Sequence, residues 1–76
     1  MHTAADLALA RRHVVDGRRR VAEQRNRIAR MTVIGLRTDE AENFLQLMLD
    51  ALAWMERHWE EIEANISRYA SAEISN

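Results

Sequence analysis

Apolar residues recur at alternating steps of three and four along two segments of the chain, separated by a break at residues 35–38. In the first segment, Leu7, Val14, Val21 and Ile28 recur every seven residues, and a second series lies three residues after each of them: Ala10, Gly17, Gln24 and Met31. In the second segment, the same alternation runs through Leu45, Met48, Leu52, Met55, Trp59, Ile62 and Ile66. This spacing puts one apolar ridge on each of two α-helices and is typical of helices that pack knobs into holes. The pattern therefore predicts an all-α chain.

The break between the two segments carries the signals of one helix ending and another beginning. Gly35 suits the left-handed position that follows many helix C-termini, and Thr38 is a good N-cap for the next helix. We therefore expect a first helix over about 4–34, a linker at 35–38 and a second helix over about 39–70. So short a linker makes the two helices antiparallel. With 76 residues in all, we expect residues 1–76 to form a single helical-hairpin domain that resembles a coiled coil.

The two ridges define an intrachain seam. Folding the chain about residue 38 places Gly17 opposite Trp59, so that the smallest seam residue faces the largest. Gln24 is the one clearly polar member, and its amide either fixes the register or lies at a seam edge open to water. The expected seam residues are Leu7, Val14, Gly17, Val21, Gln24, Ile28, Leu45, Met48, Leu52, Met55, Trp59, Ile62 and Ile66.

A second apolar stripe runs along another face of the second helix. It consists of Phe44, Leu47, Ala51, Trp54 and His58, again at steps of three and four. One neighbouring helix covers only one face, so a helix that is apolar on two faces needs a second partner. We expect a homodimer, a four-helix bundle in which the second helices cross near Ala51 and Leu47 meets Trp54 of the second copy. A docking groove for a different protein and a scattered surface patch are the alternatives.

Charge is distributed unevenly although the net charge is only −1. Residues 1–34 carry a net charge of +5 and residues 39–76 carry −7. Arg18, Arg19 and Arg20 are candidates for contact with an anion, because guanidinium groups bind phosphates well. Consecutive helical residues point in different directions, however, and no aromatic residue lies among these arginines to stack on bases. The sequence therefore favours a solvated or ion-paired flank over a nucleic-acid site.

The sequence contains no recognisable catalytic, cofactor-binding or metal-binding motif. There is no cysteine and no glycine-rich phosphate loop. His13 precedes Asp16 by three residues and His58 precedes Glu61 by three, but bundle metal sites use the opposite order together with several carboxylates. We expect no metal, no cofactor and no enzymatic activity.

The compartment is inferred from the same composition. No apolar run approaches the roughly 18 residues of a membrane span. The segment from Met1 to Ala10 has no cationic start, so it does not read as a signal peptide. We expect a cytoplasmic protein that does not enter a membrane.

The run from His13 to Arg25, with Asp6-Leu7-Ala8 before it and the Gly35 to Ala41 linker after it, resembles short uncharacterised bacterial helical-hairpin proteins. The resemblance covers about residues 6–60 and depends on His13, Gly17 and Gln24. It implies an α-hairpin and transfers neither an activity nor a site residue. The expected function is that of a small regulatory or adaptor protein that acts by protein–protein contact. The alternative is a nucleic-acid-associated regulator that uses the arginine-rich first helix.

Overall fold

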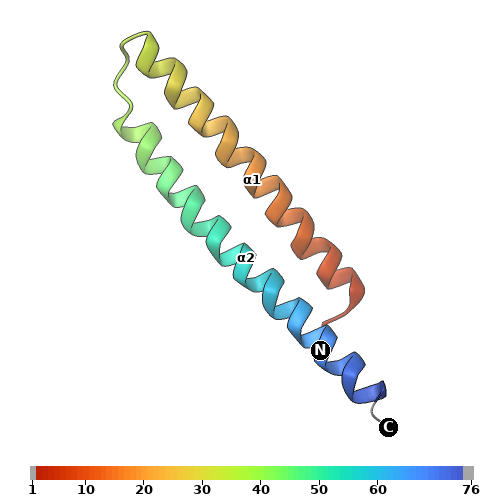
Figure 1. The fold of residues 1–76 in the computed structure, drawn as a ribbon. Coiled ribbons are helices and arrows are strands. Elements are labelled where there is room, and N and C mark those ends of the chain that lie inside the picture. The colour runs from red at the N-terminus through yellow and green to blue at the C-terminus, as the bar shows by residue number, and fades with distance from the viewer. Residues whose placement is uncertain (1, 75–76) are drawn as a thin grey trace.

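The chain forms an antiparallel hairpin of two long helices (Figure 1). The computed structural model describes the backbone of residues 2–74 and the side chains as far as Ser71. Helix α1 spans Ala4–Val33 and helix α2 spans Asp39–Ile74, and the described residues contain no strand. The molecule is a rod of 65 × 15 × 14 Å. The predicted all-α, two-helix hairpin is therefore confirmed.

The connection between the helices is short and ordered by backbone hydrogen bonds. Ile34 is the C-cap of α1, and Gly35 follows in the left-handed region with φ of +80°. The Leu36 amide donates to the Met31 carbonyl at 2.9 Å, which closes the last turn of α1. The Thr38 carbonyl accepts from the Glu42 amide at 2.8 Å, and three acidic residues occupy the first turn of α2, where the helix dipole favours them. Helix α2 continues to Ile74, beyond the end near residue 70 that the apolar pattern indicated.

The core is a thin line of apolar side chains between the helices. Val14 and Ile62 are fully buried, with exposed fractions of 0% and 1%. Val14, Val21 and Leu52 form one buried cluster, against which half-buried side chains pack: Leu45, Met48, Leu49, Met55 and Trp59. Every residue named above for the seam is buried or half-buried.

The register differs from the one obtained by folding the chain about residue 38. A Cβ atom on Gly17 would lie 3.1 Å from Leu52 Cδ1 and 3.4 Å from Met55 Cε, so Gly17 does not make room for Trp59. Leu52 precedes Trp59 by seven residues, which is one heptad. The predicted pairing of Gly17 with Trp59 is therefore wrong. A slip of seven residues keeps the same side chains in the seam, so an apolar heptad pattern does not distinguish the two registers.

With this slip, α2 extends past the start of α1 (Figure 1). Folding the chain about residue 38 would place Tyr69 opposite Leu7, but Tyr69 is 52% exposed. In Figure 1 the blue end of α2 extends past the red start of α1.

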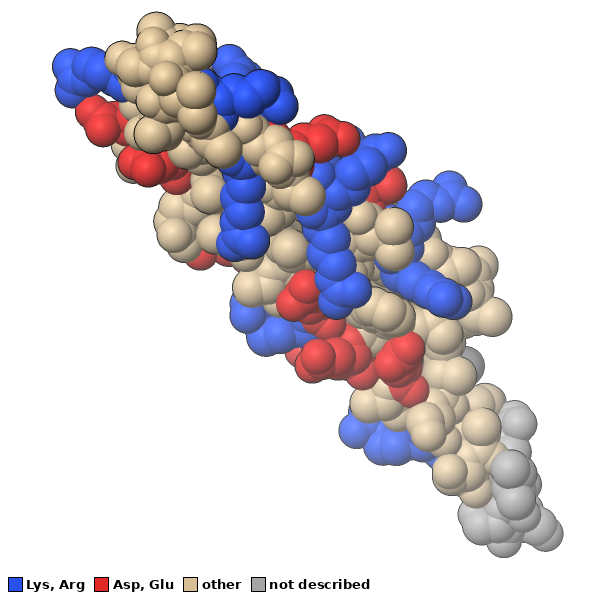
Figure 2. Space-filling view, turned by 45° about the horizontal axis from the view of Figure 1, so that its top comes forward, with Lys and Arg blue, Asp and Glu red and all other residues tan. Residues whose placement is uncertain are grey.

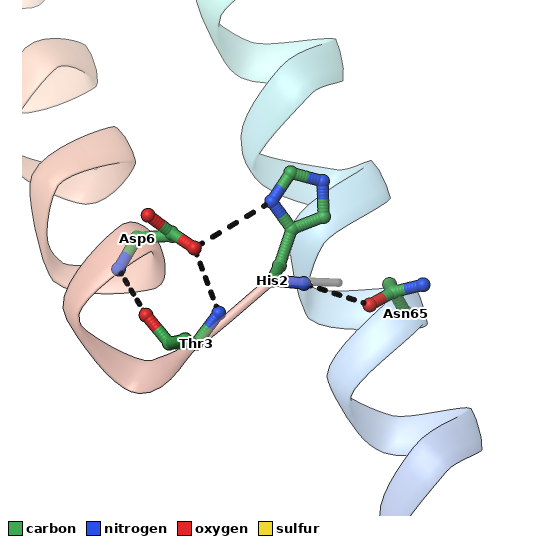
Figure 3. A network of polar contacts seen from close by, with 4 residues as sticks. All are labelled: His2, Thr3, Asp6 and Asn65. Carbon is green, nitrogen blue, oxygen red and sulfur yellow. Dashed lines mark hydrogen bonds and ion pairs between the residues drawn. The ribbon is translucent and has the colours of Figure 1, made fainter.

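A polar network fixes the start of α1 (Figure 3). Thr3 is the N-cap: its hydroxyl accepts from the Asp6 amide at 3.2 Å, and the Asp6 carboxylate accepts from the Thr3 amide at 2.8 Å. The His2 amide donates to the Asn65 side chain of α2 at 3.4 Å, and His2 Nδ1 lies 3.9 Å from the Asp6 carboxylate. The backbone hydrogen bond from Thr3 is the main reason why the pKa of Asp6 lies below its ordinary value of 3.8.

Candidate interaction surface

The second apolar stripe of α2 is open to solvent. Phe44 is 56% exposed, Leu47 66% and Trp54 58%, and Ala51 between them is also exposed. His58, at the end of the stripe, is half-buried. We call these five residues the α2 stripe. Phe44, Leu47 and Trp54 are each more than half exposed, so the hairpin presents a row of large apolar side chains to water.

Aromatic contacts hold one end of the α2 stripe in place. The Trp54 and His58 rings stack with centroids 5.0 Å apart and planes inclined by 16°. The His58 ring in turn meets the His2 ring edge-on, with centroids 6.0 Å apart and an angle of 82°. His2, which precedes α1, therefore contacts the His58 ring, and the His58 ring packs against one face of the exposed Trp54 indole.

The α2 stripe borders a groove between the two helices. Phe44 lines a hollow near the linker, Ala51 lines one in the middle, and His58 lines one near the start of α1. The middle hollow has a volume of about 210 Å³, and Gly17 and Arg20 of α1 also line it. The stripe and the groove thus form one continuous face of the hairpin.

The tip of the hairpin carries a second apolar surface, which was not among the predicted interaction residues. Val33 is 86% exposed, Ile34 70% and Leu36 54%. Arg27 and Arg30 line the hollow beside Val33 and Ile34, and Figure 2 shows uncharged surface with arginines beside it at this end of the rod. The signal was available in the sequence: Val33, Ile34 and Leu36 follow Ile28, the last seam residue of the first helix, so the seam does not bury them.

The three adjacent arginines of α1 have different environments. Arg18 Nε lies 3.3 Å from Glu56 Oε1 across the hairpin. Arg19 lies 3.8 Å from Asp16 and 3.9 Å from Glu23 on its own helix. Arg20 makes no ion pair with any described residue. Sequence adjacency therefore does not make these side chains one anion site.

Most of the other charged side chains of α1 are solvated. No ion pair within the described part of the chain involves Arg11, Arg12, Arg25, Arg27 or Arg30. Figure 2 shows arginine side chains spread along the visible face, with acidic groups between some of them. Arg18–Glu56 is the one ion pair among the described residues that joins the two helices.

The geometry provides no metal-binding cluster among the residues that the structure describes. No three His, Asp or Glu side chains of residues 2–71 lie close enough together to hold an ion. His13 lines the middle hollow together with Asp16, and His58 lines the hollow near the start of α1. Both of these hollows are lined mainly by apolar surface, which suits an apolar side chain.

Comparisons with known proteins do not place this chain in a family. No protein-family model matches it, and no significant match occurs among curated proteins or among solved structures. Within the described residues, neither helix has a long enough apolar stretch to cross a lipid bilayer.

Proposed function

We propose that this chain is a small non-enzymatic protein–protein interaction module, and that it assembles as a homodimer through the α2 stripe. In this dimer the two hairpins form a four-helix bundle. The observation that carries the proposal is the exposure of Phe44, Leu47 and Trp54, each more than half open to solvent along one face of α2. A regulatory or adaptor role suits a small module that offers such a binding surface.

The α2 stripe lies on a different face of the helix from the seam. At 3.6 residues per turn, it is displaced from the seam by roughly a quarter of a turn. A helix in a four-helix bundle has two neighbours at about this angle, and α1 is only one of them. An indole alone buries about 150–250 Å² when it is covered, so leaving it in water forgoes a large apolar contribution.

The order of residues along the α2 stripe favours a second copy as the partner. Phe44 precedes Ala51 by seven residues and His58 follows it by seven. A two-fold axis at Ala51 would therefore bring aromatic residues opposite each other at both ends of the contact. The methyl side chain of Ala51 lets two helix backbones approach closely at the centre.

Sedimentation equilibrium of Trp54→Glu tests this proposal. A carboxylate in the middle of an apolar interface would lose its hydration without gaining a partner, so this variant should sediment as a monomer where the wild type is a dimer. Val15→Glu is the matched control, because Val15 is 56% exposed and belongs to α1. A wild-type monomer, or an unchanged dimer in Trp54→Glu, would refute self-association through this stripe.

The unpaired arginines of α1 support a second candidate function, binding of a nucleic acid. Arg11 and Arg25 are two heptads apart and flank Arg18 on one side of α1, and neither makes an ion pair with a described residue. An Arg11→Glu/Arg25→Glu variant should lose binding in a gel-shift assay. Binding by the wild type should weaken steeply between two salt concentrations, as counterion release requires. Wild-type binding without salt dependence, or an unchanged variant, would count against this candidate.

A further inference from the structure

The middle hollow of the groove is the most apolar of the three hollows that border the α2 stripe. It has a volume of about 210 Å³ and lies where Gly17 of α1 faces Met48, Ala51 and Met55 of α2. We infer that this hollow receives the Trp54 indole of a second copy of the chain. The inference rests on the proposed homodimer and adds to it which side chain enters which site.

The two-fold symmetry of the proposed dimer places the Trp54 indole of one copy at the middle hollow of the other. When two α2 helices cross antiparallel at Ala51, a residue three positions after the crossing faces one three positions before it. Trp54 follows Ala51 by three and Met48 precedes it by three. Trp54 of one copy therefore lies over Met48 of the other, at the wall of the hollow. The two-fold axis creates the same contact twice.

The walls of the hollow suit an indole. Gly17 lines the hollow with backbone only, since a Cβ there would point at Leu52 in the seam, and Ala51 contributes only a methyl group. Met48 and Met55 line two sides, and thioether side chains adapt to aromatic rings and contact their edges favourably. A hollow of this size holds several water molecules at about 30 Å³ each. An entering ring displaces them from largely apolar walls.

A charged group is also available to the ring. Arg20 lines the hollow and makes no ion pair with a described residue. A guanidinium group over an indole face is a favourable cation–π contact. The Trp54 ring is stacked on His58 within its own chain, and more than half of the Trp54 surface remains open. An interface contact therefore adds to the existing stack.

The first experiment tests whether two copies cross at Ala51. The sequence contains no cysteine, so Ala51→Cys introduces a single thiol. At a helix separation of about 9 Å and a Cα radius of about 2.3 Å, the two Cα atoms approach to about 4.4 Å, at the lower end of the range of disulfides. Ala51→Cys should form a covalent dimer under mild oxidation, and Val15→Cys on α1 should not.

The second experiment follows the indole. Trp59→Phe leaves Trp54 as the single tryptophan and removes an indole N–H that is buried without a hydrogen-bond partner among the described residues. As this protein is concentrated into the dimer, Trp54 emission should shift to the blue and acrylamide quenching should fall. In the dimer, Trp54→Leu should weaken association about tenfold, and Phe44→Leu should weaken it less.

The outcomes separate this inference from the dimer itself. An Ala51→Cys cross-link with Trp54 emission that stays red-shifted overturns the inference and leaves the homodimer standing. A blue shift without the cross-link means that the indole is buried at another contact, which also overturns it. Failure to self-associate at any concentration removes the proposed homodimer and the inference together. Only the cross-link combined with the blue shift and the larger effect of Trp54→Leu supports it.

Discussion

The Gln24 side chain donates a hydrogen bond of 3.0 Å from Nε2 to the backbone carbonyl of Ala41, in the first turns of α2. Gln24 is 9% exposed, and it is the buried polar residue of α1. Because the acceptor is a backbone carbonyl of α2, this hydrogen bond sets which residue of α2 lies beside Gln24 of α1. Of the two alternatives for Gln24, fixing the register and lying at an open seam edge, its burial and this hydrogen bond favour the first.

Replacing Gln24 by glutamate should destabilise the hairpin. A carboxylate there would face the carbonyl oxygen of Ala41 in a buried seam and would lose the donated hydrogen bond. We expect a loss of at least about 2 kcal/mol in the free energy of unfolding at pH 7. Gln24→Leu is the control: it removes the polar group as well as its contact, and the loss should stay within about 1 kcal/mol. Urea denaturation of both variants measures this, and equal effects would contradict a register-setting role.

Enlarging Gly17 should cost stability because the seam is already closed there. The nearest atom to an added Cβ is Leu52 Cδ1 at 3.1 Å. That methyl group lies at the far end of a flexible side chain, so Gly17→Ala should stay within about 1 kcal/mol of wild type, helped by the better helix propensity of alanine. Gly17→Leu forces the helices apart and should destabilise by about 1–3 kcal/mol. Thermal unfolding against the exposed control Ala22→Leu measures the difference, and a Gly17→Leu variant as stable as that control would contradict this packing.

Truncating Ile62 should be the most damaging apolar substitution near the start of α1. Its side chain is 1% exposed, so Ile62→Ala removes buried methyl groups and leaves a cavity, at a cost of about 2–5 kcal/mol. Val33→Ala at the tip should change stability by less than about 0.5 kcal/mol, because Val33 is 86% exposed. Chemical denaturation of the two variants side by side tests the assignment. Similar losses of stability in the two variants would mean that Ile62 is not part of the core.

The sequence predicted residues of the buried core, but it predicted neither Leu49, which packs against that core, nor the register of the two helices. The three-four spacing identified Val14, Val21 and Leu52, which form the buried cluster. It did not identify which residue faces Gly17, because a helix that slides by one heptad presents the same ridge. The register depends on single contacts such as that between Gln24 and Ala41, and a periodic pattern carries no information about these.

The candidate surface was predicted in part. The spacing of Phe44, Leu47 and Trp54 predicted a stripe away from the seam, and all three side chains are exposed. The hollow beside Ala51 was not predicted, because it depends on Gly17 of the other helix, and hence on the register. The separate environments of Arg18, Arg19 and Arg20 also follow from the structure, since a helix turns adjacent residues away from one another.

The capping box at the start of α1 should make stability depend on acidic pH. The folded-state pKa of Asp6 is lowered, chiefly by the Thr3 backbone hydrogen bond, whereas its unfolded value is near 3.8. The ionised carboxylate therefore stabilises the hairpin fully above about pH 5, and this contribution is lost as the pH falls through the folded-state pKa. Asp6→Asn should reduce the loss of stability between pH 5 and pH 2 that is measured by urea denaturation at each pH. Asp50→Asn, outside the capping box, is the matched control, and equal pH profiles for Asp6→Asn and wild type would argue against this role.

The Arg18–Glu56 ion pair should contribute little to the stability of the hairpin, although it is the described ion pair that joins the two helices. The Arg18 side chain is 58% exposed and the Glu56 side chain 38%, so water screens the attraction and both side chains lose conformational freedom. A double-mutant cycle with Arg18→Gln and Glu56→Gln should give a coupling free energy below about 1 kcal/mol, falling further in high salt. A larger or salt-independent coupling would show that this pair is desolvated, in which case the charged flanks, and not only the apolar seam, would hold α1 against α2.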